Sequence, residues 1–389
     1  MHIKSLPQPG DEESVLSQHL QAAICDEIEV AGGKIGFDRY MEMALYYPGL
    51  GYYAGGQQKF GSQGDFVTAP EVSSLYGQAL ARQVAELLQQ LDKGCVIEFG
   101  AGSGKLAVDL VTQLEADDAL PQSYTIIELS AELRHRQQQT IRESIPQHES
   151  LFHWLDHLPE SHVEAVIIAN EVLDAMPVHR FRHTAGRFEE LLVGCREGRS
   201  VTSWGRCSVV LTDAITALSV DFDEGYESEI NLRLRPWIHA LSDLLGRGAV
   251  LLVDYGYARS DYYHPDRYSG TLMCHYRHIA HDDALLWPGL QDITSHVDFT
   301  AVAEAASAVD LDVHGYTSQG NFLIGCGIDE LIAESGQGLN MTDSYSQAGA
   351  VKRLMLPTEM GEVFKVMALG RGIEQPLRGF GFRDLTGSL

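Results

Sequence analysis

The sequence predicts an α/β fold of the doubly wound type, built around a parallel sheet. Four short apolar runs alternate along the chain with stretches of helical periodicity, as expected for strands buried on both faces of a sheet. These runs are Cys95–Phe99, Tyr124–Glu128, Ala165–Ala169 and Ala249–Asp254. The first run ends in a turn with three glycines at alternate positions, and a helical stretch starts at Lys105. Strand, glycine turn and helix in this order are typical of folds that bind a nucleoside-bearing ligand.

The part of the chain before the first strand is expected to be helical. Between Asp11 and Val30, leucine and isoleucine recur at four-residue spacing, and acidic residues stand where they favour a helix N-terminus. A second helix is expected at about Phe37–Tyr46, and the Gly- and Pro-containing segment 47–56 after it excludes regular structure. A third helical stretch, Glu71–Leu91, leads into the first strand.

Two segments interrupt the alternation of strands and helices. Residues His179–Val210 alternate polar and apolar side chains around Thr184–Arg187, which predicts a β-hairpin insertion. Gly225–Leu245 is expected to be the helix that returns to the sheet, and Gly256–Pro288, rich in Tyr, His and Asp, an irregular excursion. The C-terminal elements expected are a helix over Phe299–Val309 and strands near Leu311–Tyr316 and Val363–Leu369.

The charge and composition exclude several classes of protein. Lys and Arg number 28 and Asp and Glu number 54 among the 389 residues, which gives a formal charge of −26. No basic stretch is present, so we expect no nucleic-acid partner. The same acidity suits a cationic ligand or a protein bearing Lys or Arg, and it also serves solubility alone. No apolar run reaches the length of a membrane span, so we expect none.

The cysteines are scattered along the chain without a Cys-x-x-Cys pair, and several lie in apolar runs. They are Cys25, Cys95, Cys195, Cys207, Cys274 and Cys326. This spacing predicts buried thiols in a reducing compartment rather than a disulfide framework. The segment Met1–Ser14 has neither the apolar core of a secretion signal nor the Arg-rich character of a transit peptide. We therefore expect a cytoplasmic protein.

The glycine turn is the strongest local signal for a ligand site. Its spacing, G-x-G-x-G, is one residue tighter than the dinucleotide pattern G-x-G-x-x-G, and an acidic residue stands two positions before it. Glycine at these positions lets the backbone turn sharply and approach a ligand closely. The tighter spacing favours a ligand without a pyrophosphate. The cofactor-binding residues predicted here are Glu98, Gly100, Ala101, Gly102, Ser103 and Gly104.

The end of the second strand supplies the next part of the predicted site. Glu128 can accept hydrogen bonds from both hydroxyls of a ribose, and Leu129 beside it is included among the cofactor-binding residues. In an alternative interpretation, Glu128 only caps the helix that starts at Ser130. A tight glycine turn together with an acid at the end of the second strand favours S-adenosyl-L-methionine as cofactor. NAD is the competing interpretation.

Seven blocks of sequence resemble one known family. Four of them are Gly64–Glu71 (GDFVTAPE), the glycine turn, Asn170–Val178 (NEVLDAMPV) and Leu252–Tyr257 (LVDYGY). The further blocks are Asp292–Phe299, Ser318–Leu323 and Met360–Val366. In order from about Gly36 to about Arg371, the chain resembles the MidA-like S-adenosylmethionine-dependent methyltransferases, relatives of the mitochondrial arginine methyltransferase of complex I assembly. Several relatives have Pro and Arg where this chain has Ala101 and Ser103, but the glycines are intact.

The resemblance implies a class I methyltransferase fold, Rossmann-like with a seven-stranded sheet. The best understood member of the family methylates an arginine of a respiratory complex I subunit, so the implied activity is protein arginine methylation. We expect an N-terminal helical extension at 1–60 and a methyltransferase domain at 61–371. Insertions in that domain are expected at about 179–225 and 256–298, and a C-terminal tail at 372–389.

Carboxylates are the candidates for the chemistry of the site. A guanidinium stays protonated in water, and paired carboxylates can hold it and localise its charge while a nitrogen attacks the methyl group. Glu171 and Asp174 follow the third strand, at the carboxyl edge where such sheets bind ligands, and are the first candidates. Their alternative role is a capped turn leading into Pro177.

A second acidic pair lies before the third helix. Asp65 is a further catalytic candidate, although an Asx-turn after Gly64 would also explain it, and Glu71 is its partner. Gly64, Pro70 and Glu71 are included among the cofactor-binding residues. Asn170 is expected to bond the methionine moiety or the adenine edge, or merely to end its strand.

The remaining alternatives concern metals, partners and other activities. His275, His278 and His281 follow Cys274, but no carboxylate or cysteine pattern completes a recognised zinc spacing, so no metal is expected.

The expected partner is a protein with an accessible arginine, and a homodimer is a candidate assembly. The competing functions are an S-adenosylmethionine-binding assembly factor with little turnover and an NAD-dependent oxidoreductase. Nucleic-acid methylation lacks both a basic patch and an Asn/Asp-Pro-Pro-aromatic turn.

Overall fold

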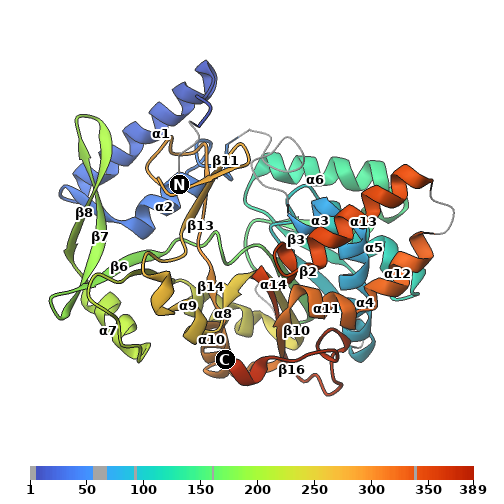
Figure 1. The fold of residues 1–389 in the computed structure, drawn as a ribbon. Helices are drawn as coiled ribbons and strands as arrows, with labels where there is room; N and C mark the ends of the chain where they lie inside the picture. Colours follow the sequence, from blue (N-terminus) through green and yellow to red (C-terminus); the bar gives the residue numbers. More distant parts are fainter. Residues whose placement is uncertain (1–5, 56–67, 92–93, 160–161, 337–339) are drawn as a thin grey trace. The chain divides into compact units, whose positions relative to one another are not determined.

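The chain forms two compact units, each assembled from separate segments. The computed structural model describes residues 6–55, 68–91, 94–159, 162–336 and 340–389 (Figure 1). The central-sheet unit comprises Val67–Leu173, Trp237–Ala258 and Asp298–Leu389. The accessory unit comprises Met1–Phe66, Asp174–Pro236 and Arg259–Val297. The N-terminal segment and much of the two expected insertions therefore belong to one compact unit.

The central sheet has the strand order β15-β16-β10-β5-β2-β3-β4. Its strands are β2 (Cys95–Phe99), β3 (Tyr124–Ile127), β4 (Phe152–Leu155), β5 (Val163–Asn170), β10 (Leu245–Tyr257), β15 (Asp312–Ser318) and β16 (Phe364–Arg371). The strands from β10 to β4 are parallel, and β16 runs antiparallel to both of its neighbours. The predicted α/β class is confirmed. The path has the seven expected strands, and the two-residue β14 (Val297–Asp298), which pairs with β10, makes an eighth.

Burial on both faces explains the nearly unbroken apolar runs of the parallel strands. Val166, Ile167 and Ile168 of β5 are fully buried, and so is the run Ala249–Leu252 of β10. The helices of this unit are α3 (Ala69–Val72), α4 (Ser74–Gln90), α5 (Lys105–Ala116), α6 (Ala131–Ser144), α8 (Leu234–Leu244, which starts in the accessory unit), α10 (Phe299–Ser307), α11 (Gln319–Gly325), α12 (Ile328–Ser335), α13 (Met341–Met355) and α14 (Met360–Val363). Short 3-10 turns lie at Pro146–Leu151, Pro265–Arg267, Arg378–Phe380 and Thr386–Ser388.

The helix expected over Glu71–Leu91 is divided in two. Ser73 has an extended backbone, with φ −163° and ψ 143°, and separates α3 from α4. Its Oγ accepts a hydrogen bond from the amide of Leu75 at 3.2 Å, which caps the start of α4. The prediction of one continuous helix was therefore wrong at its first turn, because a serine that favours capping stands there.

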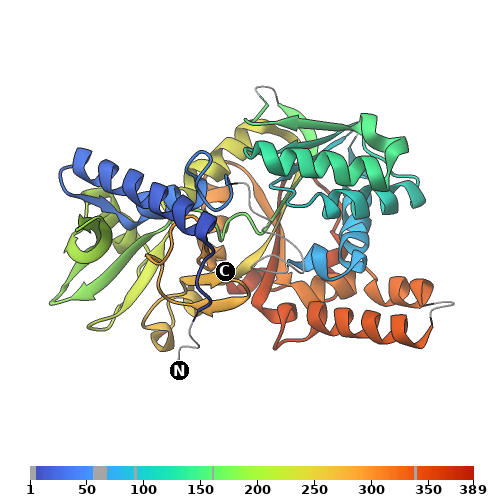
Figure 2. The same cartoon turned by 90° about the horizontal axis from the view of Figure 1, so that it is seen from above.

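The accessory unit is built from antiparallel sheets and N-terminal helices. One sheet has the order β1-β7-β6-β9, with β8 paired to β7, and the other has the order β12-β11-β13. The elements are α1 (Asp11–Val30), β1 (Lys34–Gly36), α2 (Phe37–Tyr46), β6 (His179–Thr184), β7 (Arg187–Arg196), β8 (Arg199–Arg206), α7 (Val209–Ala217), β9 (Glu227–Ile230), α9 (Arg259–Tyr262), β11 (Met273–Tyr276), β12 (Ile279–His281) and β13 (Asp292–Thr294). Helix α1 contacts β7 and β8 (Figure 1, Figure 2). Among the helices of the described ranges, none has the length and hydropathy that crossing a membrane requires.

The predicted hairpin is confirmed, and its turn has the expected chemistry. Ala185 and Gly186 both have positive φ, 49° and 70°, between β6 and β7. A second hairpin then adds β8. The prediction that Gly256–Pro288 is irregular was wrong in part. Strands β11 and β12 form a further hairpin there, with its turn at Arg277 and His278.

The prediction of a helix over Gly225–Leu245 was wrong in the first half of this range. Residues Glu227–Ile230 form β9, which pairs with β6, so sheet pairing overrides the helical pattern. The helix α8 starts only at Leu234. The Oδ1 atom of Asn231 accepts the amides of Arg233 and Leu234 at 2.9 and 3.1 Å, and this cap sets the start.

Two of the cysteines form a disulfide, which corrects the prediction that all six are thiols. Cys25 of α1 and Cys195 of β7 are bonded across a sequence separation of 170, with their Cα atoms 5.4 Å apart. The other four cysteines are free. The pairing follows from the packing of α1 against β7, which no local spacing reveals.

Arg371, at the end of β16, ties three parts of the central-sheet unit together. One guanidinium nitrogen donates to the carbonyls of Ser242 and Leu245 at 3.1 and 2.6 Å. The other donates to the Ser242 hydroxyl at 2.7 Å and to the Val309 carbonyl at 3.1 Å. These bonds satisfy carbonyls near the ends of α8 and α10.

We expect Arg371→Lys to lower the free energy of unfolding by about 2–3 kcal/mol, because an ammonium cannot make this forked set of bonds. Urea unfolding followed by circular dichroism measures the change. The matched control is Arg247→Lys, since Arg247 Nε makes an exposed bond to the Gly372 carbonyl at 3.2 Å. Equal effects of the two substitutions would contradict the prediction.

Candidate active site

The carboxyl ends of four parallel strands lie side by side in the central sheet. Phe99 of β2 is paired with Ile127 of β3 and with Ala169 of β5. Asn170, the last residue of β5, is paired with Val253 of β10. The residues that follow these strands therefore emerge at one edge of the sheet, where doubly wound folds bind ligands. The predicted site residues Gly100, Glu128, Asn170 and Glu171 all lie at this edge.

The glycine turn after β2 has the backbone that its sequence predicts. Gly100, Gly102 and Gly104 have φ of +61°, +53° and +84°, which L side chains rarely adopt. Gly104 caps α5, and a Cβ there would lie 3.2 Å from the Cα of Gln137. The turn thus combines left-handed backbone with close packing against α6. Ala101, between the glycines, is buried.

The segment before α4 contacts this turn. The Ser103 hydroxyl donates a hydrogen bond to Oε1 of Glu71, and its Oγ accepts the amide of Lys105 at 3.3 Å. Pro70 is buried in the first turn of the short helix α3, beside Glu71. The structure therefore brings two of the predicted sequence blocks together. Two other predicted residues, Gly64 and Asp65, lie outside the described residues.

Glu128 is held in place by a buried glutamine. Its Oε1 accepts the Ser130 amide at 2.9 Å and its Oε2 accepts the Gln137 side-chain amide at 2.9 Å. Gln137 also donates to the Gly102 carbonyl at 3.2 Å and accepts from the Trp154 indole at 3.0 Å. Burial raises the pKa of Glu128, while these donors oppose the rise. The hydrogen bond from the Ser130 amide is the contact expected if Glu128 caps the start of α6. The binding of ribose hydroxyls by Glu128 stays a prediction.

Leu129 is strongly exposed for a large apolar residue. Its relative exposure is 74%, and it directly follows Glu128 at the edge of the sheet. An isolated apolar side chain on a surface needs no special cause. Its predicted contact with a cofactor remains a prediction.

Glu98 is a buried acid inside β2. Its side chain is 2% exposed in relative terms, and Oε2 accepts the Tyr124 hydroxyl at 2.7 Å. Burial raises the pKa of Glu98 to about 7, against the lowering effect of the tyrosine hydrogen bond. The carboxyl group therefore titrates near neutral pH in this structure.

Asn170 and Glu171 form a short chain of hydrogen bonds at the end of β5. The Tyr76 hydroxyl of α4 donates to Asn170 Oδ1 at 2.5 Å, and Asn170 Nδ2 donates to Glu171 Oε1 at 3.1 Å. Glu171 has φ +55°, a conformation that costs a non-glycine residue about 1–3 kcal/mol and that is frequent at functional sites. Burial and the nearby carboxylates of Glu171 and Asp254 raise the pKa of Tyr76 well above 10.

Asp254 holds the turn that carries Glu171. Its Oδ2 accepts hydrogen bonds from the amides of Val172 and Leu173 at 3.2 and 2.8 Å, and its side chain is almost fully buried in the last third of β10. The amide of Glu171 donates to the Val253 carbonyl at 2.8 Å. The strained residue is thus fixed from both sides by β10. Asp174, three residues later, is buried and belongs to the accessory unit, so its pairing with Glu171 stays a prediction.

Three residues of this edge were absent from the predicted site: Tyr76, Gln137 and Asp254. Tyr76 and Gln137 lie on amphipathic helices, where one polar residue carries no signal of its own. Asp254 does carry a signal, because a carboxylate at the end of a buried apolar run lies near the edge where ligands bind. The sequence therefore located the turns at the site but not the side chains that support them.

The raised pKa of Glu98 makes a prediction for stability against pH. The folded protein keeps a proton on Glu98 that the unfolded chain releases between pH 4.5 and about 7, so the free energy of unfolding falls as pH rises through this window. Glu98→Gln cannot ionise and still accepts the Tyr124 hydrogen bond. We expect this variant to be more stable than wild type by about 1–3 kcal/mol at pH 8.

Urea unfolding between about pH 5 and pH 8 measures this difference. The control is Glu164→Gln, which changes an exposed glutamate near the start of β5. The control should keep the wild-type pH dependence. An unchanged pH slope in Glu98→Gln would contradict the assignment of the titration to this residue.

The chain is similar in sequence and in fold to S-adenosylmethionine-dependent methyltransferases. A family model described as "Putative S-adenosyl-L-methionine-dependent methyltransferase" matches residues 79–317. A Burkholderia thailandensis protein whose crystal structure contains S-adenosyl-homocysteine is 43% identical, with a TM-score of 0.94 over 99% of this chain and 100% of its own. A native crystal structure from the same organism is 42% identical, with a TM-score of 0.91 and the same coverage.

Similarity to curated proteins extends over nearly the whole chain. The Mus musculus "Protein arginine methyltransferase NDUFAF7, mitochondrial" is 28% identical, over 93% of this chain and 86% of its own. The Caenorhabditis elegans homologue of that name is 26% identical, over 94% and 89%. These findings confirm the family resemblance and the class I methyltransferase fold. The chain belongs to the MidA-like family of S-adenosyl-L-methionine-dependent methyltransferases.

Proposed function

We propose that this protein transfers a methyl group from S-adenosyl-L-methionine to an arginine side chain of a protein substrate. The observation that carries the proposal is Glu171, a carboxylate in a strained conformation beside the strand that bears the glycine turn. Family membership supports the methyl transfer, and the names of the curated relatives support arginine as the acceptor. By the same resemblance, a respiratory complex I subunit is the candidate substrate.

The edge of the sheet fits the cofactor. The three glycines of the turn leave backbone without side chains next to α5, so a ligand can approach it closely. Glu128, oriented by Gln137, is the candidate acceptor for ribose hydroxyls, and Leu129 is a candidate apolar contact for the base. S-adenosylmethionine, when bound, supplies a methyl group that is already activated for transfer. The crystallised relative contains S-adenosyl-homocysteine, which is the product of such a transfer.

The protein's part in the reaction is to bind and position the guanidinium. Glu171, with Asp174 as the second candidate, accepts hydrogen bonds from the guanidinium and draws its charge away from the attacking nitrogen. Overall, the substrate nitrogen gains a methyl group and loses one proton, which the carboxylate of Glu171 can accept. Asn170 and Tyr76 orient Glu171, and Asp254 fixes its backbone through the following turn.

The second acidic pair has a different role in this proposal. Glu71 accepts a hydrogen bond from Ser103 inside the glycine turn, so its contacts favour support of the cofactor over catalysis. Asp65 remains a catalytic candidate on sequence grounds, in the same block as Gly64 and Pro70.

We expect Glu171→Gln to bind S-adenosylmethionine as wild type does but to lose methyl transfer by about 100-fold or more, because a neutral amide cannot localise the guanidinium charge. Cells lacking the gene are complemented with wild type, Glu171→Gln or Glu164→Gln, and methyl-arginine is mapped by peptide mass spectrometry. A specific methyl-arginine should return only with wild type and Glu164→Gln.

Calorimetry with S-adenosylmethionine, S-adenosyl-homocysteine and NAD accompanies this experiment. Binding of NAD but of neither S-adenosyl compound would contradict the assignment of S-adenosylmethionine as the cofactor. Cofactor binding with methyl-arginine unchanged by deletion of the gene would contradict the arginine substrate and favour an assembly factor with little turnover. The two failures are therefore distinguishable.

We expect Gln137→Met to weaken S-adenosylmethionine binding by about 10-fold, which corresponds to the loss of one or two positioning hydrogen bonds. Methionine fills the same volume but cannot donate to Glu128 or to the Gly102 carbonyl. The matched control is Gln139→Met on the same helix, whose side chain bonds Glu143 in an exposed position. Calorimetry should show wild-type affinity for the control. Equal affinities of the two variants would contradict the positioning role of Gln137.

A further inference from the structure

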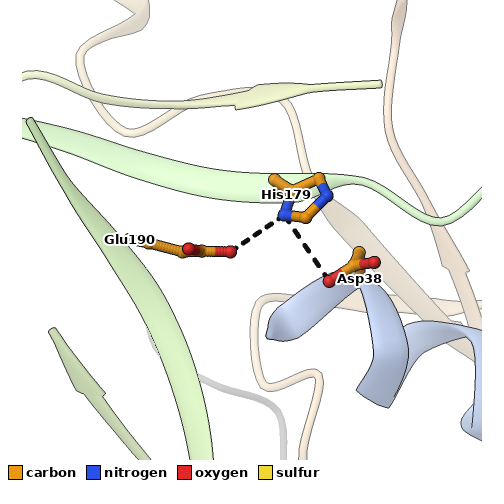
Figure 3. A group of neighbouring side chains, drawn as sticks. All are labelled: Asp38, His179 and Glu190. Carbon is orange, nitrogen blue, oxygen red and sulfur yellow. Dashed lines mark hydrogen bonds and ion pairs between the residues drawn. The ribbon is translucent and has the colours of Figure 1, made fainter. Parts of the chain in front are cut away.

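Three side chains from three elements of the accessory unit converge on one point. Asp38 lies in the first turn of α2, His179 starts β6 and Glu190 lies in β7 (Figure 3). His179 Nδ1 is 2.9 Å from Glu190 Oε1 and 3.5 Å from Asp38 Oδ1. The three atoms all lie within 4.8 Å of one another. The same ring nitrogen therefore faces two carboxylate oxygens.

The backbone leaves room for this convergence at Gly36. Its φ of −65° and ψ of 154° are open to any residue, so backbone conformation does not require a glycine there. A Cβ at Gly36 would lie 2.4 Å from Asp38 Oδ1 and 3.3 Å from Glu190 Oε1. A side chain would thus occupy the space in which the two oxygens meet.

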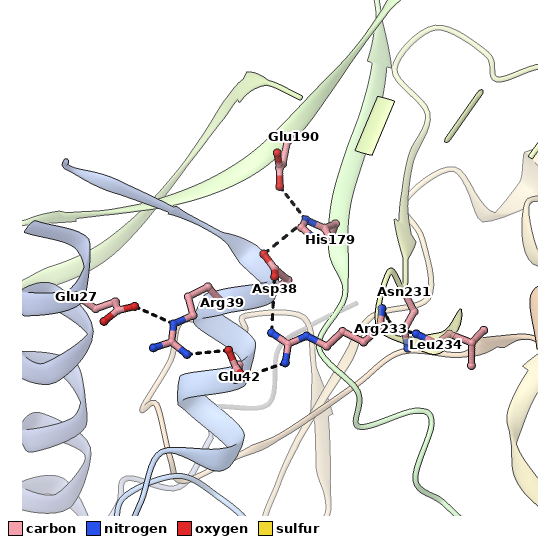
Figure 4. Close-up of polar contacts among 9 residues, drawn as sticks. All are labelled: Glu27, Asp38, Arg39, Glu42, His179, Glu190, Asn231, Arg233 and Leu234. Carbon is pink, nitrogen blue, oxygen red and sulfur yellow. Dashed lines mark hydrogen bonds and ion pairs between the residues drawn. The ribbon is translucent and has the colours of Figure 1, made fainter. Parts of the chain in front are cut away.

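The surroundings of the cluster carry excess negative charge. A line of ion pairs runs from Glu27 through Arg39 and Glu42 to Arg233, at distances of 2.9, 2.8 and 2.8 Å, and Arg233 lies 3.9 Å from Asp38 Oδ2 (Figure 4). The arginines hold the pKa of Glu42 down at about 2, so that carboxylate is charged at neutral pH. Together with Asp38 and with Glu190, which contacts His179, the connected set holds four carboxylates and two guanidinium groups. The net charge of this set is −2 when His179 is neutral, and one divalent cation would cancel that charge.

We propose that Asp38, His179 and Glu190 bind a divalent transition-metal ion of the zinc class. Imidazole nitrogen and carboxylate oxygen are ligands that zinc accepts, and a neutral His179 would offer its Nδ1 lone pair at the point where both oxygens converge. Arg233 lies 3.9 Å from Oδ2 of Asp38, on the side away from His179, and Oδ1 is the oxygen that faces the His179 ring. The cap at Asn231 fixes the backbone of Arg233 in turn. Three protein ligands leave at least one coordination position to water.

The residues of this site are not the histidines that the sequence analysis considered as metal ligands. Within the described ranges, Asp38, His179 and Glu190 are the one group of three metal-ligating side chains that meet; His275, His278 and His281 belong to none. The sequence prediction of no metal rested on ligand spacing, and here the ligands come from positions far apart in the chain. The ion would connect α2 to the sheet of the accessory unit.

Metal binding is tested on the full chain after treatment with a chelator. Calorimetry with Zn²⁺ and visible absorption during titration with Co²⁺ should each show one equivalent bound by wild type. We expect His179→Gln to weaken Zn²⁺ binding by about 100-fold or more. The matched control is His183→Gln, because His183 lies on the same strand and contacts the Asp223 carbonyl at 3.2 Å rather than a carboxylate. The control should bind as wild type does.

Two further variants keep the test independent of any folding defect in His179→Gln. Glu190→Gln removes one charged ligand, and Gly36→Ala keeps all three ligands but fills the space between them. Both should weaken Zn²⁺ binding, and Zn²⁺ should raise the melting temperature of wild type and His183→Gln only. Absence of Co²⁺ bands in wild type, or wild-type Zn²⁺ affinity in His179→Gln, would overturn the proposal and leave a hydrogen-bonded ion cluster.

Discussion

The register of four parallel strands is the constraint on which the candidate site depends. Phe99 stands opposite Ile127 and Ala169, and Asn170 stands opposite Val253. A shift of one residue in any of these pairings would turn the strand's side chains to the opposite face of the sheet. The backbone pairing of these strands and the close packing of their buried side chains hold this register. As a result the glycine turn, Glu128, Glu171 and Asp254 leave the sheet at one edge.

Polar contacts then convert this alignment into a defined site. Gln137 connects Glu128 to the glycine turn, and Ser103 connects the turn to Glu71. Asp254 holds the turn that carries Glu171. Each of these contacts joins a loop at this edge to a residue of another element: Gln137 of α6, Glu71 of α3 or Asp254 of β10. Buried polar groups are costly when unpaired, so this network also favours one arrangement of the loops over others.

The accessory unit shows how the acidity of the chain is distributed. The formal charge of −26 is compatible with a cationic partner or with solubility alone, and composition cannot choose between them. In the accessory unit some of the acids form a local line of ion pairs with Arg39 and Arg233. Others, Asp38 and Glu190, face a single histidine nitrogen. The charge therefore has local structural roles in addition to any general one.

Features that depend on residues close together in the chain were predictable from the sequence alone. Helices α1 and α2 have the predicted bounds, the four buried strands lie where the apolar runs predict them, and the glycines form the sharp turn predicted between β2 and α5. Local periodicity and the conformational freedom of glycine are sufficient for these. The strand β9 was missed because its pairing with β6 overrides a helical pattern.

Contacts between side chains far apart in the sequence are known only from the folded chain. The Cys25–Cys195 disulfide, the contact of Ser103 with Glu71, the buried Gln137 and the group of Asp38, His179 and Glu190 all join separate elements. Their sequence spacing carries no periodic signal, because strand register and helix packing set which residues become neighbours. For the same reason, the sequence located the glycine turn and the acids at the strand ends, while the folded chain decided how they are held.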